Sequence, residues 1–170
     1  MQQGFARLWR RPRQGQSLVE FALVAPLLVA LVVGIFELGI VFSVYIGLTN
    51  SVREVARVGA VYRYPGPPIQ TGALTNQAQI NTAVAPIDNG RLISMTDALT
   101  PTLNPIIQTA NLSPIQVAYP ELPTAANLAR SGQPISLTLS YTHTLLFGVL
   151  GDRELVLRAQ SSARIEPGGN

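Results

Sequence analysis

An uncharged apolar run near the N-terminus constrains the fold of this chain most strongly. Residues 21–36 include no charged side chain, and apolar composition resumes over residues 38–48 after Glu37. A membrane-spanning helix needs about 20 mostly apolar residues, and residues 21–36 alone extend about 24 Å against a hydrocarbon core of ~30 Å. The sequence therefore predicts a spanning helix with Glu20 and Glu37 near opposite membrane boundaries.

Basic residues before the apolar run predict its orientation. Four arginines and no acidic residue precede Glu20, namely Arg7, Arg10, Arg11 and Arg13. The positive-inside rule then places the N-terminus in the cytoplasm and the residues after the helix outside it. A cleavable secretory signal is the alternative interpretation, but its apolar region is about 7–15 residues long, shorter than the run seen here.

The helical pattern continues past the apolar run. Apolar and small residues recur at spacings of three and four, typical of a helix, at Val52, Val55, Ala56 and Gly59. The proline- and glycine-rich residues 64–68 end it. We therefore expect one helix from about Ser17 to about Val61, on the order of 65 Å long.

Part of this helix requires a covering partner. Residues 38–48 are apolar around the whole circumference, so either lipid or partner helices must bury them. Small residues four apart allow close helix contact and mark a candidate packing face, formed by Ala30, Gly34, Gly39, Ser43 and Gly47.

The remaining residues predict a small head. Residues 77–84 suggest a short helix ended by Pro86, and residues 96–108 suggest a second one, interrupted by Pro101 and Pro105. Alternating apolar and polar residues predict strands at 135–142 and 155–165 that form an antiparallel pair, with a third strand at 115–119. The expected fold class is α+β, with a long N-terminal membrane-spanning helix and a C-terminal antiparallel β-sheet packed on its outer half.

The sequence contains no constellation of residues that would carry catalysis. It has no cysteine, which excludes disulfides, thiolate metal sites and cysteine nucleophiles. His143 is the only histidine, and we expect it on the surface or at a sheet edge. No metal-ligand spacing, nucleophile elbow or phosphate loop accompanies it. We therefore predict no enzymatic activity, no cofactor and no metal.

Nucleic-acid binding is also not predicted. The net charge is +3, but four of the arginines precede the apolar run and the others are scattered beside acidic residues. Such a distribution contains no basic stripe with interleaved aromatic residues.

Residues around the start of the apolar run resemble a known family. Residues 11–28 read RPRQGQSLVEFALVAPLL and closely resemble the opening of TadE/TadG-like pseudopilins, which belong to the tight-adherence, Flp-type branch of type IV pilus systems. Gly15 followed by Glu20 and Phe21 matches the prepilin processing pattern of that family. Residues 53–60 are similar to its segment after the helix. Gln16 departs from the phenylalanine that begins most mature type IV pilins.

The resemblance implies a domain organisation and a role. Residues 1–15 would be a basic prepilin leader, residues 16–62 the transmembrane and extended helix, and residues 63–170 an extracytoplasmic head. The expected function is that of a minor pilin-like subunit, cut by a prepilin peptidase between Gly15 and Gln16. Its partners would be the lipid membrane, the peptidase, other pilin or pseudopilin subunits and the pilus-assembly platform. It would cross the bacterial cytoplasmic membrane once or enter a pilus.

Two interpretations of Glu20 remain open. A boundary carboxylate can reach the headgroups and is stabilised at a helix N-terminus. Alternatively, cleavage after Gly15 would leave an α-amino group at Gln16, and Glu20 would pair with that amine or with the amine of a neighbouring subunit. Breaking one half of such a pair leaves a lone charge, which makes the spacing important.

The function also has alternatives. One is an unprocessed single-span anchor whose head binds an envelope partner, and another is a secreted enzyme behind a signal peptide. Cleavage after Gly15 separates the pilin-like subunit from the anchor, and the absence of active-site residues weighs against the enzyme.

Overall fold

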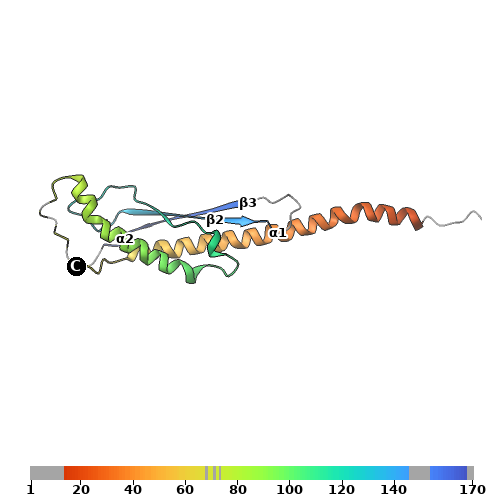
Figure 1. The fold of residues 1–170 in the computed structure, drawn as a ribbon, viewed down its shortest axis with the longest axis horizontal. Helices are drawn as coiled ribbons and strands as arrows, with labels where there is room; N and C mark the ends of the chain where they lie inside the picture. Colours follow the sequence, from red (N-terminus) through yellow and green to blue (C-terminus); the bar gives the residue numbers. More distant parts are fainter. Residues whose placement is uncertain (1–13, 68, 71, 73, 146–153, 168–170) are drawn as a thin grey trace, which may run out of the picture.

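The computed structural model describes residues 14–67, 69–70, 72, 74–145 and 154–167. Figure 1 shows an elongated molecule in which one long helix, α1 (Gln14–Val61), extends well beyond a head made of a second helix and a three-stranded sheet. The predicted α+β fold class is therefore confirmed. The predicted leader, apart from Gln14 and Gly15, lies outside the described residues.

Helix α1 is continuous over 48 residues and includes Pro26. Its length is about 72 Å at 1.5 Å per residue. The helix ends at Val61, just before the segment that contains Pro65, Gly66 and Pro67. The predicted extent and end of the helix are thus confirmed.

Helix α2 (Gln77–Thr102) differs from the prediction. We expected a short helix over residues 77–84 ended by Pro86, and a separate one over residues 96–108. Instead a single helix runs through Pro86, and Asn76 caps its start by accepting a hydrogen bond from the backbone N–H of Gln79 at 2.9 Å. The expectation of two helices was wrong.

Packing explains why α2 remains one helix through Pro86. A proline in a helix interior costs about 3 kcal/mol or more because it removes one hydrogen bond and crowds the preceding turn. The side chains that α2 buries recur at spacings of three and four across Pro86, and they are Val84, Ile87, Arg91, Met95 and Leu99. Burial of a single large apolar side chain contributes about 1.5–3 kcal/mol, so this face outweighs the cost. The helix changes direction along its length (Figure 1), as helices with internal prolines do.

A short 3₁₀ turn, η1 (Thr109–Asn111), leads into the sheet. The sheet consists of β1 (Gln116–Ala118), β2 (Pro134–Thr144) and β3 (Glu154–Arg164). The strands lie in the spatial order β1-β2-β3, and neighbouring strands are antiparallel. All three predicted strands are present. The register pairs Leu139 with Ala159.

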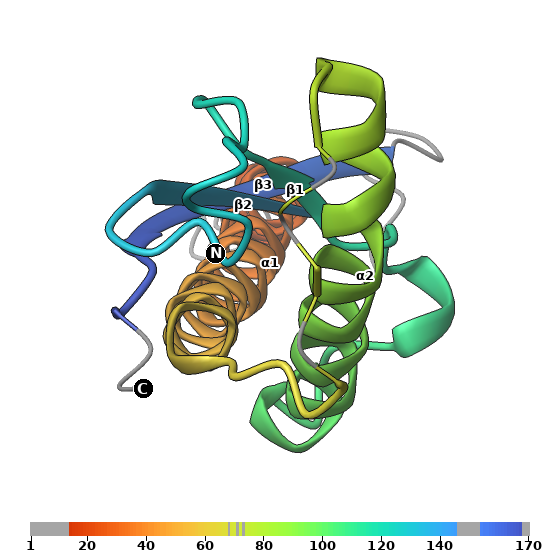
Figure 2. The same ribbon diagram turned by 90° about the vertical axis from the view of Figure 1, so that its left-hand side faces the viewer.

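The main core lies between α1 and the sheet. Alternate residues of β2 are buried, and Figure 2 shows α1 running beneath the sheet with α2 beside it. The cluster includes Val44, Leu48, Val52 and Val55 from α1, Met95 and Leu99 from α2, and Ile135, Leu137, Leu139 and Tyr141 from β2. The prediction that the sheet packs on the outer half of the long helix is confirmed.

One glycine permits the close approach of the two helices. A Cβ atom at Gly59 would clash with the side chain of Met95, which is fully buried. The absence of a side chain at this position lets α2 pack directly against the last turns of α1.

Candidate functional site

The N-terminal part of α1 is uncovered. None of the residues from 15 to 36 is buried, and the head leaves large apolar side chains exposed along this stretch, among them Phe21, Leu23, Leu27, Leu31, Ile35 and Phe36. Residues Gly15–Val61 form a helix long and apolar enough to cross a membrane. Its composition and exposure suggest a membrane anchor, because so much apolar surface is not left in water.

The predicted processing motif lies at the free end of this helix. Gly15 is in the first turn of α1, with no atom near the position of a Cβ. Gln16 is exposed, and its side-chain amide donates a hydrogen bond to Oε1 of Glu20 at 3.1 Å. Phe21 is exposed beside Glu20. The arrangement leaves all four residues accessible to another protein.

The five small residues of the candidate packing face do not share one environment. Gly34 and Gly39 have open space at the Cβ position, and Ala30 and Ser43 are half-buried. Gly47 instead faces the head of its own chain, where a Cβ would lie 3.0 Å from Cβ of Asn104. The head therefore occupies the space beside Gly47, and only the part of this row nearer the N-terminus is open to a partner.

Glu37 marks the point at which the head begins to cover α1. Its exposed fraction is 8%, and it is the first buried residue of the helix. Its Oε1 lies 3.6 Å from Nε2 of His143, which is 6% exposed and comes from the central strand β2. The expectation that His143 lies on the surface or at a sheet edge was wrong, because β2 packs its alternate residues, His143 included, toward α1.

Beyond Glu37, α1 keeps one uncovered apolar stripe. The residues of this stripe are 38, 42, 45 and 46, spaced so that they share one side of the helix, and they are Leu38, Phe42, Tyr45 and Ile46. Val44 and Leu48 are fully buried under the head. Of the segment predicted to be apolar all round, one side is thus buried within the chain and the other is open.

At the other end of the head, two buried arginines share one carboxylate. The carboxylate of Asp88 accepts a hydrogen bond from Nη1 of Arg91 at 3.2 Å and another from Nη2 of Arg130 at 3.1 Å. The guanidinium of Arg130 also lies 4.1 Å from the centre of the Tyr119 ring and donates to the carbonyl of Glu121 at 2.8 Å. Burial raises the pKa of Tyr119, and a hydrogen bond from Arg91 opposes that rise. Arg130 adopts a φ of 58°, an unusual angle for a residue with a side chain.

This charge cluster borders an open cleft of about 740 Å³. The connection after α1 lines it with Tyr62, Arg63 and Tyr64, and α2 contributes Arg91. Neither feature was predicted, because each combines residues from distant parts of the chain that form no short motif. Among residues 14–67, 69–70, 72, 74–145 and 154–167, no group of three or more histidine, aspartate and glutamate side chains is placed to hold a metal ion.

Comparison with known proteins gives a match to part of α1. Residues 15–57 match the family model described as TadE-like protein. Neither the search of curated proteins nor the search of solved structures found a match. The resemblance predicted from the motif around Gly15 is thereby confirmed over residues 15–57.

Proposed function

We propose that this TadE-like chain is a minor pilin-like subunit of a tight-adherence pilus or secretion system. In this proposal a prepilin peptidase cuts between Gly15 and Gln16, and the protein joins a helical assembly through α1. It acts by association rather than by catalysis. The observation that carries the proposal is an apolar helix that matches the family over residues 15–57 and is uncovered from residue 15 to residue 36.

The geometry of the helix supports membrane insertion before assembly. Residues 21–36 extend about 24 Å and end directly before Glu37, where the head begins. A bilayer core of ~30 Å would therefore enclose residues 21–36 and about one further turn of the helix. The head would then lie close to the outer surface of the cytoplasmic membrane, with its distal cleft directed away from that membrane.

In this proposal, Glu20 sets the axial position of one α1 helix against the next in the assembly. Its carboxylate is exposed, so the described chain does not bury it. It accepts a hydrogen bond from the side-chain amide of Gln16. Removal of the leader would create an α-amino group at Gln16, within reach of this carboxylate or of the same carboxylate in a neighbouring subunit. Such a pair in a low-dielectric bundle fixes the axial position of one helix against the next.

The N-terminal mass of membrane-extracted protein, made with and without an active prepilin peptidase, tests the processing step. We expect a mature chain beginning at Gln16 only when the peptidase is present. Gly15→Leu should block cleavage, and Gly39→Ala, which alters an open position farther along α1, should not. An intact Met1 in the presence of active peptidase would overturn the proposal.

One observation favours a second candidate. The open cleft at the distal end of the head is a concave surface that pilus assembly through α1 does not use. An unprocessed anchor whose head binds an envelope partner would use it. That candidate predicts an uncut N-terminus together with a partner that protects Tyr62 and Tyr64 in the cleft.

A further inference from the structure

The end of the β2–β3 hairpin nearest the uncovered part of α1 carries exposed apolar side chains. Leu155 is 40% exposed and Val156 is 58% exposed. Consecutive residues of a strand point to opposite faces of a sheet, so β3 presents apolar surface on both faces at this end. Farther along the strand the outward positions are polar, at Arg158 and Gln160.

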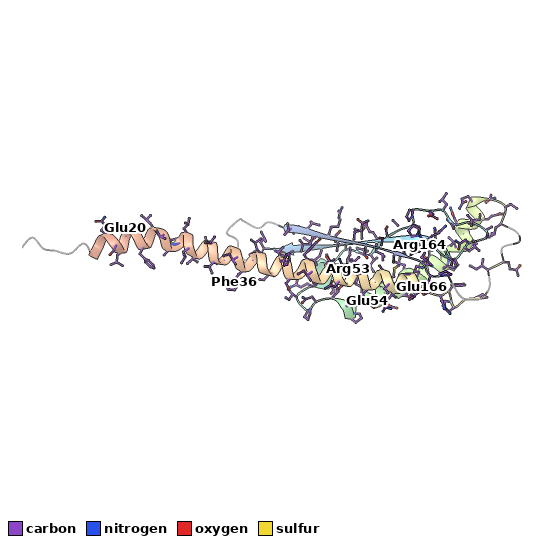
Figure 3. All side chains as sticks on the ribbon, turned by 180° about the vertical axis from the view of Figure 1, so that it is seen from behind. Glu20, Phe36, Arg53, Glu54, Arg164 and Glu166 are labelled. Atoms are coloured by element: carbon purple, nitrogen blue, oxygen red, sulfur yellow. The ribbon has the colours of Figure 1, made fainter. Side chains whose placement is uncertain are left out.

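This hairpin end is level with the point where α1 becomes covered. The register pairs Leu155 with His143, and His143 contacts Glu37. On α1 the neighbouring side chains of Phe36 and Leu38 are exposed. Figure 3 shows Phe36 on the helix close to the level at which the strands end. Apolar side chains of the helix and of the hairpin thus gather at one level along the long axis of the molecule.

We propose that Leu155 and Val156 contact the headgroup region of the membrane that α1 crosses, so that the protein touches the bilayer at two places. This inference rests on the proposed membrane anchoring of α1. Lipid is the occupant that the structure favours, because the two residues are level with the end of the uncovered apolar helix. The contact between Glu37 and His143 joins the hairpin to the helix at this level and keeps the carboxylate beneath the head.

Charge sets the depth of this contact. Glu154 is exposed and is the first residue of β3, directly before Leu155. In the strand register it pairs with Thr144. A carboxylate is costly in the hydrocarbon core but not among headgroups, so Glu154 and the start of β3 lie in the headgroup region. Gln160, four residues beyond Val156, stands roughly 13 Å farther out, in water.

The absence of cysteine from the chain makes single-site labelling direct. Val156→Cys and Gln160→Cys place a cysteine at exposed positions on the same face of β3, and each is labelled with a polarity-sensitive fluorophore. The full chain is reconstituted at low density in vesicles of phosphatidylcholine and phosphatidylglycerol. Lipids with a nitroxide near the headgroup should quench the label at position 156 and leave the label at position 160 unquenched. Circular dichroism of each variant checks that the head is folded.

Two results would overturn the proposal. Equal, weak quenching at positions 156 and 160 would place the hairpin end in water. Protection of position 156 from aqueous iodide that disappears when the protein is diluted at constant lipid would show that a second copy covers it instead.

A third label separates this inference from the anchoring of α1. Leu27→Cys lies in the uncovered helix, where a nitroxide deep in the acyl chains should quench it. Quenching at position 27 without quenching at position 156 refutes only the hairpin contact. The reverse result refutes the span of α1 on which the proposal rests, and loss of both refutes both.

Discussion

Nε2 of His143 lies 3.6 Å from Oε1 of Glu37, and both side chains are buried where the head meets the uncovered part of α1. The contact joins the only histidine of the chain to an acidic residue within its apolar helix. Because of this contact, the carboxylate of Glu37 lies against the head and not in lipid, although apolar residues precede and follow Glu37 in the sequence. The fold thereby sets the boundary between the membrane part of α1 and the part that belongs to the head.

Substitution of His143 should loosen the head at this boundary. In His143→Leu we expect a loss of about 1–3 kcal/mol in the free energy of unfolding, because a buried carboxylate loses a polar neighbour. Denaturant unfolding of the full chain in detergent, followed by circular dichroism, measures it. His143→Gln retains a polar side chain and should lose less. Equal stability of the wild type and the leucine variant would show that the contact contributes nothing.

Substitution of Glu20 should affect assembly alone. We expect Glu20→Ala to insert into the membrane and to be cut after Gly15, but to fail to join an assembly, because no carboxylate remains to pair with the new α-amino group. Crosslinking between subunits in membranes, together with the N-terminal mass, separates these steps. Glu54→Ala removes a carboxylate from α1 within the head, beyond the motif, and serves as the control. Normal assembly of Glu20→Ala would instead favour a carboxylate that only reaches the headgroups.

Asp88→Asn should destabilise the distal end of the head. The substitution leaves the buried guanidiniums of Arg91 and Arg130 without their shared countercharge, and breaking a buried ion pair costs about 3–5 kcal/mol. Because Asp88 is partly exposed, we expect a loss of about 3 kcal/mol in the free energy of unfolding. Thermal unfolding measures it, with Glu121→Gln as a nearby control that removes an exposed acidic group. A change below that of the control would refute a stabilising role for the cluster.

Tyr119 should make the head sensitive to alkaline pH. Burial raises the pKa of Tyr119 above its ordinary value of about 10, so folding favours the neutral phenol. The stability this contributes is fully present below the unfolded pKa and is lost as pH rises through the folded pKa. Melting temperatures measured from pH 8 upward should therefore fall above about pH 10. Tyr119→Phe should show a shallower fall, and identical curves for the two proteins would contradict the assignment.

The prediction from sequence was most accurate where structure depends on near neighbours. The end of α1 follows from the close succession of Pro65, Gly66 and Pro67, which together stop a helix. The alternation in β2 and β3 likewise marks a half-buried strand without reference to the rest of the chain. The interruption expected at Pro86 was wrong for a related reason, because the local penalty is real but the buried face of α2 outweighs it.

The features that the prediction missed require residues from distant parts of the chain. A lone histidine and a glutamate within an apolar run contain no spacing that links them. Arg130 and Asp88 likewise meet only because the segment before β2 folds back over α2. No short motif could have indicated either pair.

The sequence by itself determined the apolar helix, its length, its family resemblance and the strands of the head, because each depends on side chains within a few residues of one another. Only the tertiary structure decided which side of α1 is covered, where its uncovered part ends and which charges are buried. Those properties arise when β2 and α2 pack against α1, since that packing removes some polar groups from water and forces them to find partners. Glu37 and His143 are neighbours for that reason.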